Sequence, residues 1–318
     1  TVTPVADTAS SFGDTLVFRA QAVDTRGVSV AGATFAWSLV SSLVSSQTGP
    51  EAVIGSLLAA GDSVAFIAQL NGTDGIRATS GGISATADVV VSQTPASVAI
   101  APDSVHFTSI GDGATYRGSI SDARGNAVVG ASYAWTRAGT SVQFNGVTNA
   151  DTAQVTTVGS GATTLTLAAT RDGITAQGTA KAVVEVAAAT VTLTPDAVTL
   201  TSVGDSTTFT ATARDGNNNV IVGEPFTLSS SSPAVATVDS TGVAIAVSNG
   251  TTTITATASN GVSTTSTVTV QQQTTAVTVT PVADTASSFG DTLVFRAQAV
   301  DAGGSQVAGA TFSWAFVD

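Results

Sequence analysis

TVTPVADTASSFGDTLVFRAQAVD, residues 1–24, occurs twice in this chain, and the second copy fills residues 278–301 without a change. The likeness continues to residues 41 and 318, where 33 of the 41 paired positions are identical, so the text repeats at an offset of 277 residues. Self-similarity at a fixed period is the sequence mark of a repeat protein. Because 277 residues exceed one ordinary domain, a shorter unit is expected inside the long one.

A shorter, more diverged period lies within the long one. Each unit contains a proline, an aspartate 20 residues later and a glycine 8 residues after that. The four aspartates are 98, 93 and 86 residues apart, which together make the long offset: Asp24, Asp122, Asp215 and Asp301. We therefore predict three domains, at 1–94, 95–188 and 189–273, and a segment 274–318 that is the N-terminal half of a fourth domain repeating the first.

Each unit has the alternation of a strand with one buried face. Leu16, Phe18 and Ala20 fall on one face, and polar or β-branched residues fall on the other. A turn rich in Asp, Gly and Asn follows, then a strand that brings in a second large apolar residue. Two positions in each unit are predicted to form the core: Phe18, Trp37, Tyr116, Trp135, Phe209, Leu228, Phe295 and Trp314.

The second half of each unit ends in a hairpin pattern. Its turns are Gly81-Gly82, Arg171-Asp172-Gly173 and Asn260-Gly261, each between two runs rich in Val, Thr and Ala. Nowhere does an apolar stripe with helical period exceed about two turns. About seven short strands per unit, with no helix, predict an all-β fold of tandem immunoglobulin-like Greek-key β-sandwiches.

The third unit resembles a known family. The residues that carry the resemblance are Val191-Thr-Leu-Thr-Pro195, Gly204-Asp205, Phe209-Thr-Ala-Thr-Ala213, Val235-Ala-Thr-Val-Asp239, Gly242-Val243 and Asn249-Gly-Thr-Thr-Thr-Ile-Thr-Ala-Thr257. Taken together they are similar to the group-2 bacterial immunoglobulin-like domain, the module of intimin- and invasin-type adhesins and other surface proteins. The first two units keep only the N-terminal half of this pattern. The resemblance implies a stalk or adhesion role and implies no catalytic residues.

Composition and charge restrict the partners. The chain has 22 acidic and 10 basic residues, a net charge of −12, a single lysine and no cysteine. Such a chain repels phosphate backbones, so nucleic acid is an unfavourable partner, and the charge favours solubility. There is no disulfide framework, no run of 18 apolar residues and no Met at position 1, so we expect this window to be internal to a longer secreted chain, without a membrane segment.

The sequence contains no catalytic or metal-binding set. His106 is the single histidine and has no cysteine to join in a zinc site, and no Gly-x-Ser-x-Gly elbow occurs. The glutamates, Glu51, Glu185 and Glu224, fall in different units. We expect no enzyme activity, no cofactor and no metal. The strongest calcium alternative is Asp215-Gly-Asn-Asn-Asn219, with the single carboxylates that stand near predicted domain starts: Asp7, Asp103, Asp196 and Asp284.

The motifs that could indicate glycosylation or sugar binding can each be explained without either function. The sequons Asn71-Gly-Thr73 and Asn249-Gly-Thr251 are readily explained by chance, and the Thr-rich faces by β-propensity rather than O-linked sugar. The tryptophans could be sugar platforms, but their fixed place two residues after another aromatic favours core packing.

The junctions and the last segment bear on assembly. The predicted linkers, near 93–97, 187–189 and 271–276, have no Gly/Ser run, so we expect a semi-rigid series of domains that advances on the order of 100 Å over three sandwiches. The half-domain would expose Leu293, Phe295, Phe312 and Trp314 unless it is completed. We expect completion by continuation of the chain beyond Asp318, favoured by the long period, or by strands of a neighbouring subunit.

These features favour a structural segment of a long extracellular or cell-surface stalk or filament, whose partners are further copies of the repeat in the same chain or in neighbouring subunits. The alternative is a ligand-binding adhesin segment that recognises a host receptor or polysaccharide. A third class is a non-catalytic region of a giant secreted enzyme or a phage virion decoration. Receptor and organism are not encoded in any motif.

Overall fold

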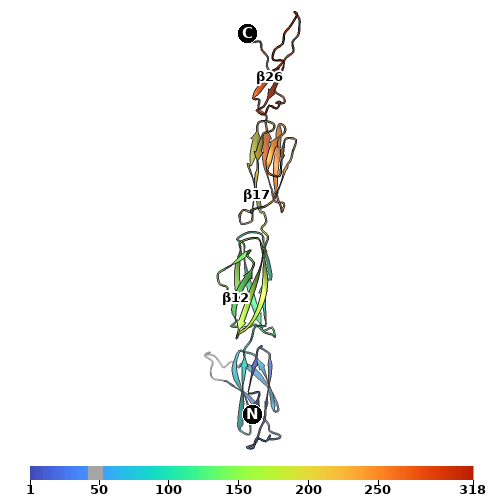
Figure 1. The fold of residues 1–318 in the computed structure, drawn as a ribbon. Coiled ribbons are helices and arrows are strands. Elements are labelled where there is room, and N and C mark those ends of the chain that lie inside the picture. Colours follow the sequence, from blue (N-terminus) through green and yellow to red (C-terminus); the bar gives the residue numbers. More distant parts are fainter. Residues whose placement is uncertain (42–52, 318) are drawn as a thin grey trace. The chain divides into compact units, whose positions relative to one another are not determined.

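A computed structural model describes residues 1–41 and 53–317, and every regular element in these ranges is a β-strand (Figure 1). Glu51 lies outside the described residues. Within them, no helix is long and apolar enough to cross a membrane. The chain divides into two compact units, one of Thr1–Phe107 with Gly111–Val184 and one of Thr108–Ile110 with Glu185–Asp318.

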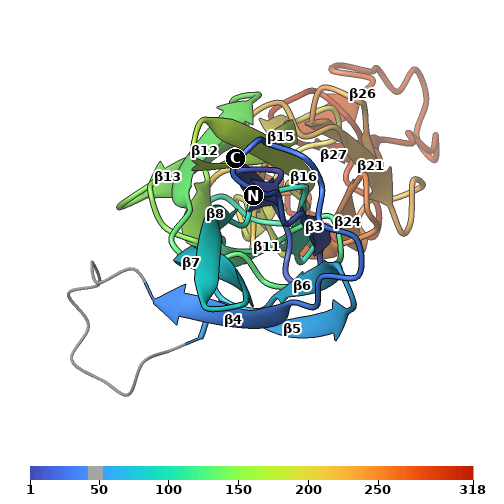
Figure 2. The same cartoon turned by 90° about the horizontal axis from the view of Figure 1, so that it is seen from below.

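The first unit begins with a sandwich of two four-stranded sheets, called here the first sandwich, whose sheets face each other (Figure 2). One sheet has the order β1 (Val2–Thr3), β3 (Thr15–Ala20), β6 (Ser63–Ala68), β5 (Gly55–Ala60). The other has the order β2 (Ala6–Ala9), β8 (Ile83–Val91), β7 (Gly72–Ser80), β4 (Ala36–Ser41).

The same unit contains a second sandwich of the same design. One sheet has the order β13 (Val142–Asn145), β14 (Thr152–Thr157), β11 (Gly113–Ser121), β9 (Ser97–Ala101). The other has the order β10 (Ser104–Phe107), β16 (Ile174–Val184), β15 (Gly161–Arg171), β12 (Ser132–Ala138). The predicted hairpin around Asp172-Gly173 is confirmed, since β15 and β16 pair from Gly161↔Val184 to Arg171↔Ile174.

The chain changes sheets near the start of each sandwich. In the first, β1 pairs antiparallel with β3, and after Pro4 the chain crosses to the other sheet, where β2 pairs parallel with β8. Proline has no N–H to donate, so it suits the break between two edge strands. Pro102 and Pro195 stand at the same switch, and each of these prolines follows a cis peptide bond.

The second unit contains a third sandwich in which one strand is interrupted. Its strands are β17 (Thr190–Thr194), β18 (Ala197–Leu200), β19 (Ser206–Thr208), β20 (Thr210–Arg214), β21 (Phe226–Ser230), β22 (Ala236–Val238), β23 (Val243–Ala246), β24 (Gly250–Ala258) and β25 (Ser263–Val270). The sheets have the orders β18-β25-β24-β21, β19-β23-β22 and β17-β20. The break between β19 and β20 falls at Phe209, whose N–H donates to the Gly242 carbonyl over 2.8 Å.

A two-stranded sheet ends the described chain. β26 (Ala276–Thr280) pairs antiparallel with β27 (Arg296–Val300) in a register that includes Val279↔Ala297 and Thr280↔Arg296. This register equals that of β1 with β3, where Val2 pairs with Ala20 and Thr3 with Arg19. The identical text of the two segments therefore forms the same strand pairing twice.

The cores lie between the sheets and are built from the inward-facing positions. Val, Ile, Leu and Ala dominate, together with fully buried aromatics: Phe18 and Phe66 in the first sandwich and Tyr116 in the second. The predicted all-β, tandem sandwich class is confirmed by these sheets. The predicted domain limits are compatible with the strand ranges but remain a prediction.

Gly242 is a position that the third sandwich requires to be glycine. Its φ is +92°, and a Cβ there would lie 2.2 Å from the Phe209 carbonyl oxygen. We predict that Gly242→Ala makes the amides of β24 and β25 exchange about tenfold faster than in Gly261→Ala, since a clash of this kind costs about 1–3 kcal/mol and about 1.4 kcal/mol corresponds to a tenfold change.

Gly261 is the matched control for that measurement, because its φ is +89° but a Cβ there would meet nothing within 4 Å. Both variants carry the left-handed strain, and only Gly242→Ala adds the clash. Equal hydrogen-exchange rates in the two variants would contradict the prediction.

Candidate functional site: a carboxylate turn at the sandwich boundaries

The aspartates that mark the short period all form the same turn. In the second sandwich, Asp122 Oδ1 accepts the backbone N–H groups of Arg124 and Asn126, each at 2.9 Å. The Gly125 N–H donates to the Asp122 carbonyl at 3.0 Å, and Gly125 has a φ of +85°, a conformation that favours glycine. Asp122 Oδ1 thereby fixes the backbone of the turn, whereas Oδ2 accepts only the Asn126 side-chain amide from the same turn, at 3.2 Å.

The other three turns use their first oxygen in the same way. Each accepts backbone N–H groups two or four residues further on at 2.8–3.0 Å: Asp24 from Arg26 and Val28, Asp215 from Asn217 and Asn219, and Asp301 from Ser305. In the third sandwich Asn218 replaces the glycine and adopts a φ of +66°. Asparagine tolerates this conformation better than most side chains.

The second oxygen of three of these aspartates binds the backbone of an earlier loop. Asp122 Oδ2 accepts the Phe12 N–H at 3.0 Å, within the first unit. In the second unit, Asp215 Oδ2 accepts the Ile110 N–H at 2.8 Å and Asp301 Oδ2 accepts the Val203 N–H at 2.9 Å. We call these three residues the junction aspartates.

The donor loops are equivalent to one another. Phe12, Ile110 and Val203 each stand between a serine and a Gly-Asp pair, in the loop that follows the sheet switch. The three serines are buried: Ser11, Ser109 and Ser202. The junction aspartates are 2–3% exposed, whereas Asp24 is exposed and accepts no hydrogen bond from another sandwich among the described residues.

At two of the three junctions, a glutamine in the preceding linker donates a further hydrogen bond to the junction aspartate. Gln93 is fully buried, and its Nε2 donates to Asp122 Oδ2 at 3.1 Å and to the Ala127 carbonyl at 3.2 Å. Asn71 holds this glutamine by accepting its backbone N–H at 2.7 Å and donating to its side-chain oxygen at 3.2 Å. The linker is therefore hydrogen-bonded to both sandwiches that it joins in the first unit.

The C-terminal junction repeats the same arrangement. Gln272 Nε2 donates to Asp301 Oδ2 at 2.9 Å and to the Gln306 carbonyl at 3.1 Å. Asn249 accepts the Gln272 N–H at 2.7 Å and donates to its side-chain oxygen at 3.1 Å. Asn71 and Asn249 are the asparagines of the two sequons, so the sequons coincide with structural amides.

Asp215 uses asparagines in place of the glutamine. Asn219 Nδ2 and Asn217 Nδ2 each donate to the Ile110 carbonyl at 2.9 Å, and the Gly216 N–H donates to Ser109 Oγ at 3.0 Å. Together with the aspartate, these amides bind both the N–H and the C=O of one residue. The Asp-Gly-Asn-Asn-Asn text considered for calcium is here a hydrogen-bonded turn.

A salt bridge and a hydroxyl contact add to the first junction. Arg124 Nε donates to Asp14 Oδ1 at 2.7 Å, where Asp14 belongs to the donor loop. Ser92 Oγ also donates to the carboxylate of Asp172 in the β15–β16 turn. The ion pair is half-exposed and contributes little by itself, so the buried aspartate carries most of the link.

The hydrogen bonds keep the junction aspartates ionised. Burial acts to raise the pKa of Asp122, but the bonds from Gln93, Asn126 and Phe12 outweigh it and hold the pKa below the ordinary value. The pKa of Asp215 is lowered by the same balance of burial and donated N–H groups. For Asp301 the largest cause of the lowered pKa is the Gln272 amide.

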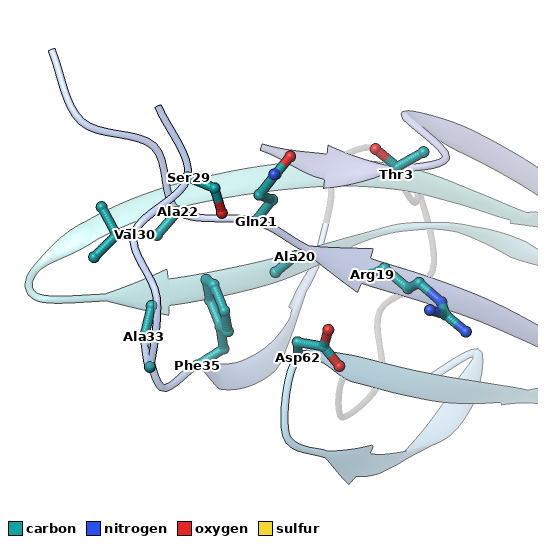
Figure 3. A pocket seen from close by; sticks show the side chains of 11 residues that line it. Thr3, Arg19, Ala20, Gln21, Ala22, Ser29, Val30, Ala33, Phe35 and Asp62 are labelled. Atoms are coloured by element: carbon teal, nitrogen blue, oxygen red, sulfur yellow. The ribbon is translucent and has the colours of Figure 1, made fainter. Parts of the chain in front are cut away.

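The first sandwich has an open pocket of about 410 Å³ near its Asp24 turn (Figure 3). Val30, Ala33 and Phe35 lie toward one side of it, and Arg19 and Asp62 lie toward the other. Ala20, the last residue of β3, and the following Gln21 and Ala22 also line the pocket.

The eight residues predicted for the core occupy different environments. Phe18, Tyr116, Trp135 and Phe209 are buried, and Trp37 and Leu228 are partly buried against the core clusters. The Nε1 of Trp135 donates to the Ala150 carbonyl at 2.9 Å, and burial raises the pKa of Tyr116 to about 12. Phe295 and Trp314, in the C-terminal segment, are 39% and 59% exposed.

The candidates for metal and catalytic chemistry lie apart. His106 is exposed on β10, and the carboxylates of Asp7 and Asp284 accept the N–H of the next residue. Among the described residues, no group of three His, Cys, Asp or Glu side chains converges as metal ligands would. Glu185 and Glu224 fall in different parts of the second unit, and the Glu224 carboxylate accepts from Ser259.

Sequence reasoning found the junction aspartates but assigned them only to turns. The missed partners were the two glutamines. Gln93 and Gln272 both precede a junction aspartate by 29 residues. They also follow Asn71 and Asn249 by 22 and 23 residues. This spacing was a readable signal, although the pairing needs the fold to bring linker and turn together.

The fold and the repeated boundary define a tandem immunoglobulin-like β-sandwich protein. Residues 187–270 match the family model of the bacterial Ig-like domain (group 2), which confirms the resemblance of the third unit. The search of curated proteins returned no match.

Solved structures of several proteins with tandem domains are similar to this chain at low identity. The extracellular cadherin domains 1–4 of protocadherin gamma B7 are 14% identical, with 94% of this chain and 84% of that chain covered and a TM-score of 0.35. An I-band fragment of titin is 10% identical, with 84% and 95% covered and a TM-score of 0.39. Domains 1–6 of the surface layer protein SbsC are 16% identical, with 96% and 44% covered and a TM-score of 0.29. Similarity at this level carries no argument about function.

Removing a junction carboxylate should loosen the loop that it holds. We predict that Asp122→Ala lowers the hydrogen-exchange protection of the Phe12 amide about tenfold or more, since a hydrogen bond to a charged group is worth about 1.5–3 kcal/mol. The exchange of amides in β15 should change little. Asp24→Ala is the matched control, because it removes the same turn bonds without a partner in another sandwich. Unchanged protection at Phe12 would contradict a junction role for Asp122.

The first junction should also depend on pH. A carboxyl whose pKa is lowered on folding stabilises the folded arrangement above its unfolded value of about 3.9, and this contribution is lost as the pH falls through the folded value. We therefore predict that the Phe12 protection factor, corrected for intrinsic exchange, is constant from neutral pH to about 4.5 and falls below about 4. Loss of protection near neutral pH would assign the link to another group.

Proposed function

We propose that this chain is a structural repeat segment of a long extracellular or cell-surface stalk or filament, without catalytic activity. Its function would be to hold successive sandwiches in a defined relation, so that the length of the chain is the property that matters. Further copies of the repeat, in the same chain or in neighbouring subunits, would be its partners.

The observation that supports this proposal most is the repetition of the junction aspartate. A buried carboxylate binds the backbone of an earlier loop three times along the chain, at Asp122, Asp215 and Asp301. Ligand recognition by loops does not require the same turn at every domain boundary. Repetition of one linking device fits a protein that is built to be extended.

The linkers support the same reading. The linkers between the sandwiches are short and contain no flexible Gly/Ser segment. In two of these linkers a glutamine donates a hydrogen bond to the aspartate of the next turn. Free rotation between domains would break these hydrogen bonds, which are made to a charged carboxylate and are therefore stronger than bonds between neutral groups.

The alternative is an adhesin segment that binds a glycan or receptor through loops. This alternative predicts that the segment still binds its ligand after the hydrogen bonds of the junction aspartates are removed. Family membership of the third unit is compatible with either role, since group-2 bacterial Ig-like domains occur in surface proteins of both kinds.

Small-angle scattering of the full chain tests the structural role. We predict a maximum dimension above 100 Å, from about 40 Å per sandwich, and a measurable decrease of the mean dimension in the double variant Asp122→Ala/Asp301→Ala. Asp24→Ala/Asp103→Ala is the control with the same loss of charge. A double variant with unchanged dimensions, together with glycan-array binding by the wild type, would favour the adhesin.

A further inference from the structure

Strand β5 (Gly55–Ala60) forms the border of one sheet of the first sandwich. It pairs antiparallel with β6 on one side, and among the described residues no strand pairs with its other side (Figure 2). Its six residues are Gly, Ser, Leu, Leu, Ala and Ala, without a charge or a proline. An exposed edge of this length and composition is a template for pairing with a strand of another chain.

The ladder between β5 and β6 shows which backbone groups the free side offers. The Gln69 N–H donates to the Ile54 carbonyl at 2.8 Å, one position beyond the end of β5 in the same register. In an antiparallel ladder every second residue bonds to the partner strand. The even-numbered residues of β5 therefore bond to β6. The odd-numbered residues direct their N–H and C=O groups to the free side: Gly55, Leu57 and Ala59.

The outward face of this sheet carries an apolar row that ends at the free side of β5. Val17 of β3 pairs with Ala65 of β6, and Ala65 pairs with Leu58 of β5. Val17 is 51% exposed and Leu58 is 62% exposed. Ile67, the next outward residue of β6, is half-buried beside them. Cross-strand neighbours on one face contact one another, so the row is continuous from β3 to the edge of the sheet.

The other two sandwiches are polar and shorter at the same place, which β13 and β22 occupy. In the second sandwich the corresponding row is Thr115, Gln154 and Asn145, and β13 has four residues. In the third sandwich β22 has three residues and is followed by the exposed Asp239. Short edge strands and charged residues both hinder pairing between sheets. The long apolar edge is therefore a property of the first sandwich and not of every unit of the repeat.

We propose that β5 pairs antiparallel with β5 of a second copy of this chain, about a two-fold axis at Leu58. Residues directly opposite one another in an antiparallel pair lie on the same face, so outward residues meet outward residues. Leu58 then lies opposite Leu58 of the other copy, and Ser56 lies opposite Ala60. Leu57 and Ala59, whose backbone groups face the free side, exchange their N–H···O=C bonds across the axis. The contact is isologous, because both copies use the same strand.

A second copy fits this edge because the strand is complementary to itself. On the inward face the large Leu57 meets the small Ala59 of the other copy. On the outward face the two Leu58 side chains meet in a non-hydrogen-bonded pair, the kind of pair in which side chains approach most closely. The apolar row of one copy continues into the row of the other, and the contact removes the exposed side of Leu58 from water.

Local charge does not oppose the contact, although each copy has a net charge of −12. The charged residue nearest to β5 along the chain is Asp62, in the turn that leads to β6. In the proposed register Asp62 lies opposite Ile54 of the other copy, so the two Asp62 carboxylates do not face each other. Repulsion between more distant carboxylates is screened over about 8 Å at physiological ionic strength. The contact is therefore tested at that ionic strength.

This inference goes beyond the proposed function, which concerns the junctions along one chain, and names the strand through which a neighbouring copy binds. The two ideas fail separately. Scattering from dilute single chains tests the dimensions that the junction aspartates maintain, and it does not require contact between copies. Pairing through β5, in turn, uses no residue of the junctions.

Engineered cysteines test the register in the full chain, which has none of its own. Opposite residues of a non-hydrogen-bonded pair lie within the Cα–Cα range of a disulfide. We expect Leu58→Cys to form an oxidised homodimer of twice 31.1 kDa at least about tenfold faster than Ile83→Cys, because pairing raises the effective concentration of the thiols. Ile83 is the matched control, since it is 80% exposed in the same sandwich but belongs to β8 of the other sheet. A mixture of Ser56→Cys and Ala60→Cys chains should form the heterodimer faster than either chain forms a homodimer.

A charge variant tests the contact without a disulfide. In sedimentation velocity over a series of concentrations, we expect the wild-type chain to form a reversible dimer. Leu58→Lys should abolish this dimer, because two like charges would lie opposite each other at the axis, and Ile83→Lys should leave it unchanged. Oxidation of Leu58→Cys no faster than that of Ile83→Cys, or a dimer that survives Leu58→Lys, overturns the proposal and leaves the edge of β5 to a strand of another protein.

Discussion

A carboxylate has two oxygens, and this chain uses them for two different tasks at each boundary. One oxygen of the junction aspartate accepts the backbone N–H groups of its own turn and fixes the side chain. The other accepts a backbone N–H from a loop of the preceding sandwich, as Asp122 does from Phe12. The hydrogen bonds within the turn already fix the rotamer of the aspartate. Little further side-chain conformational entropy is therefore lost when its second oxygen binds the neighbouring loop. A single buried residue can therefore link two sandwiches without a large apolar interface.

The sandwiches supply the fixed geometry that such a link needs. Each turn follows a strand whose inward positions are held by the core, and the donor loop follows the switch of the edge strand from one sheet to the other. The two ends of a sandwich thus carry complementary groups, an N–H at one and a carboxylate at the other. Buried amides such as Gln93 satisfy the remaining carboxylate sites, which is the condition for burying a charge at low cost.

The C-terminal segment illustrates how far context decides the fate of one sequence. Phe18 and Phe295 stand in identical text and begin from the same strand register, yet one is fully buried and the other is 39% exposed. Strand identity sets the register, and burial depends on which residues complete the second sheet.

The sequence was enough to predict the fold class, the repeat, the hairpins and the positions of the junction aspartates, because strand alternation and turn chemistry are local and recur at readable spacing. It could assign Asp122 only to a turn, since a carboxylate's first partners lie two and four residues away. Only the tertiary structure placed the Phe12 N–H and Gln93 on its second oxygen, across 110 and 29 residues. It also showed that Trp135 is buried and donates its Nε1–H to the Ala150 carbonyl, because burial is a property of the neighbours that a fold assembles.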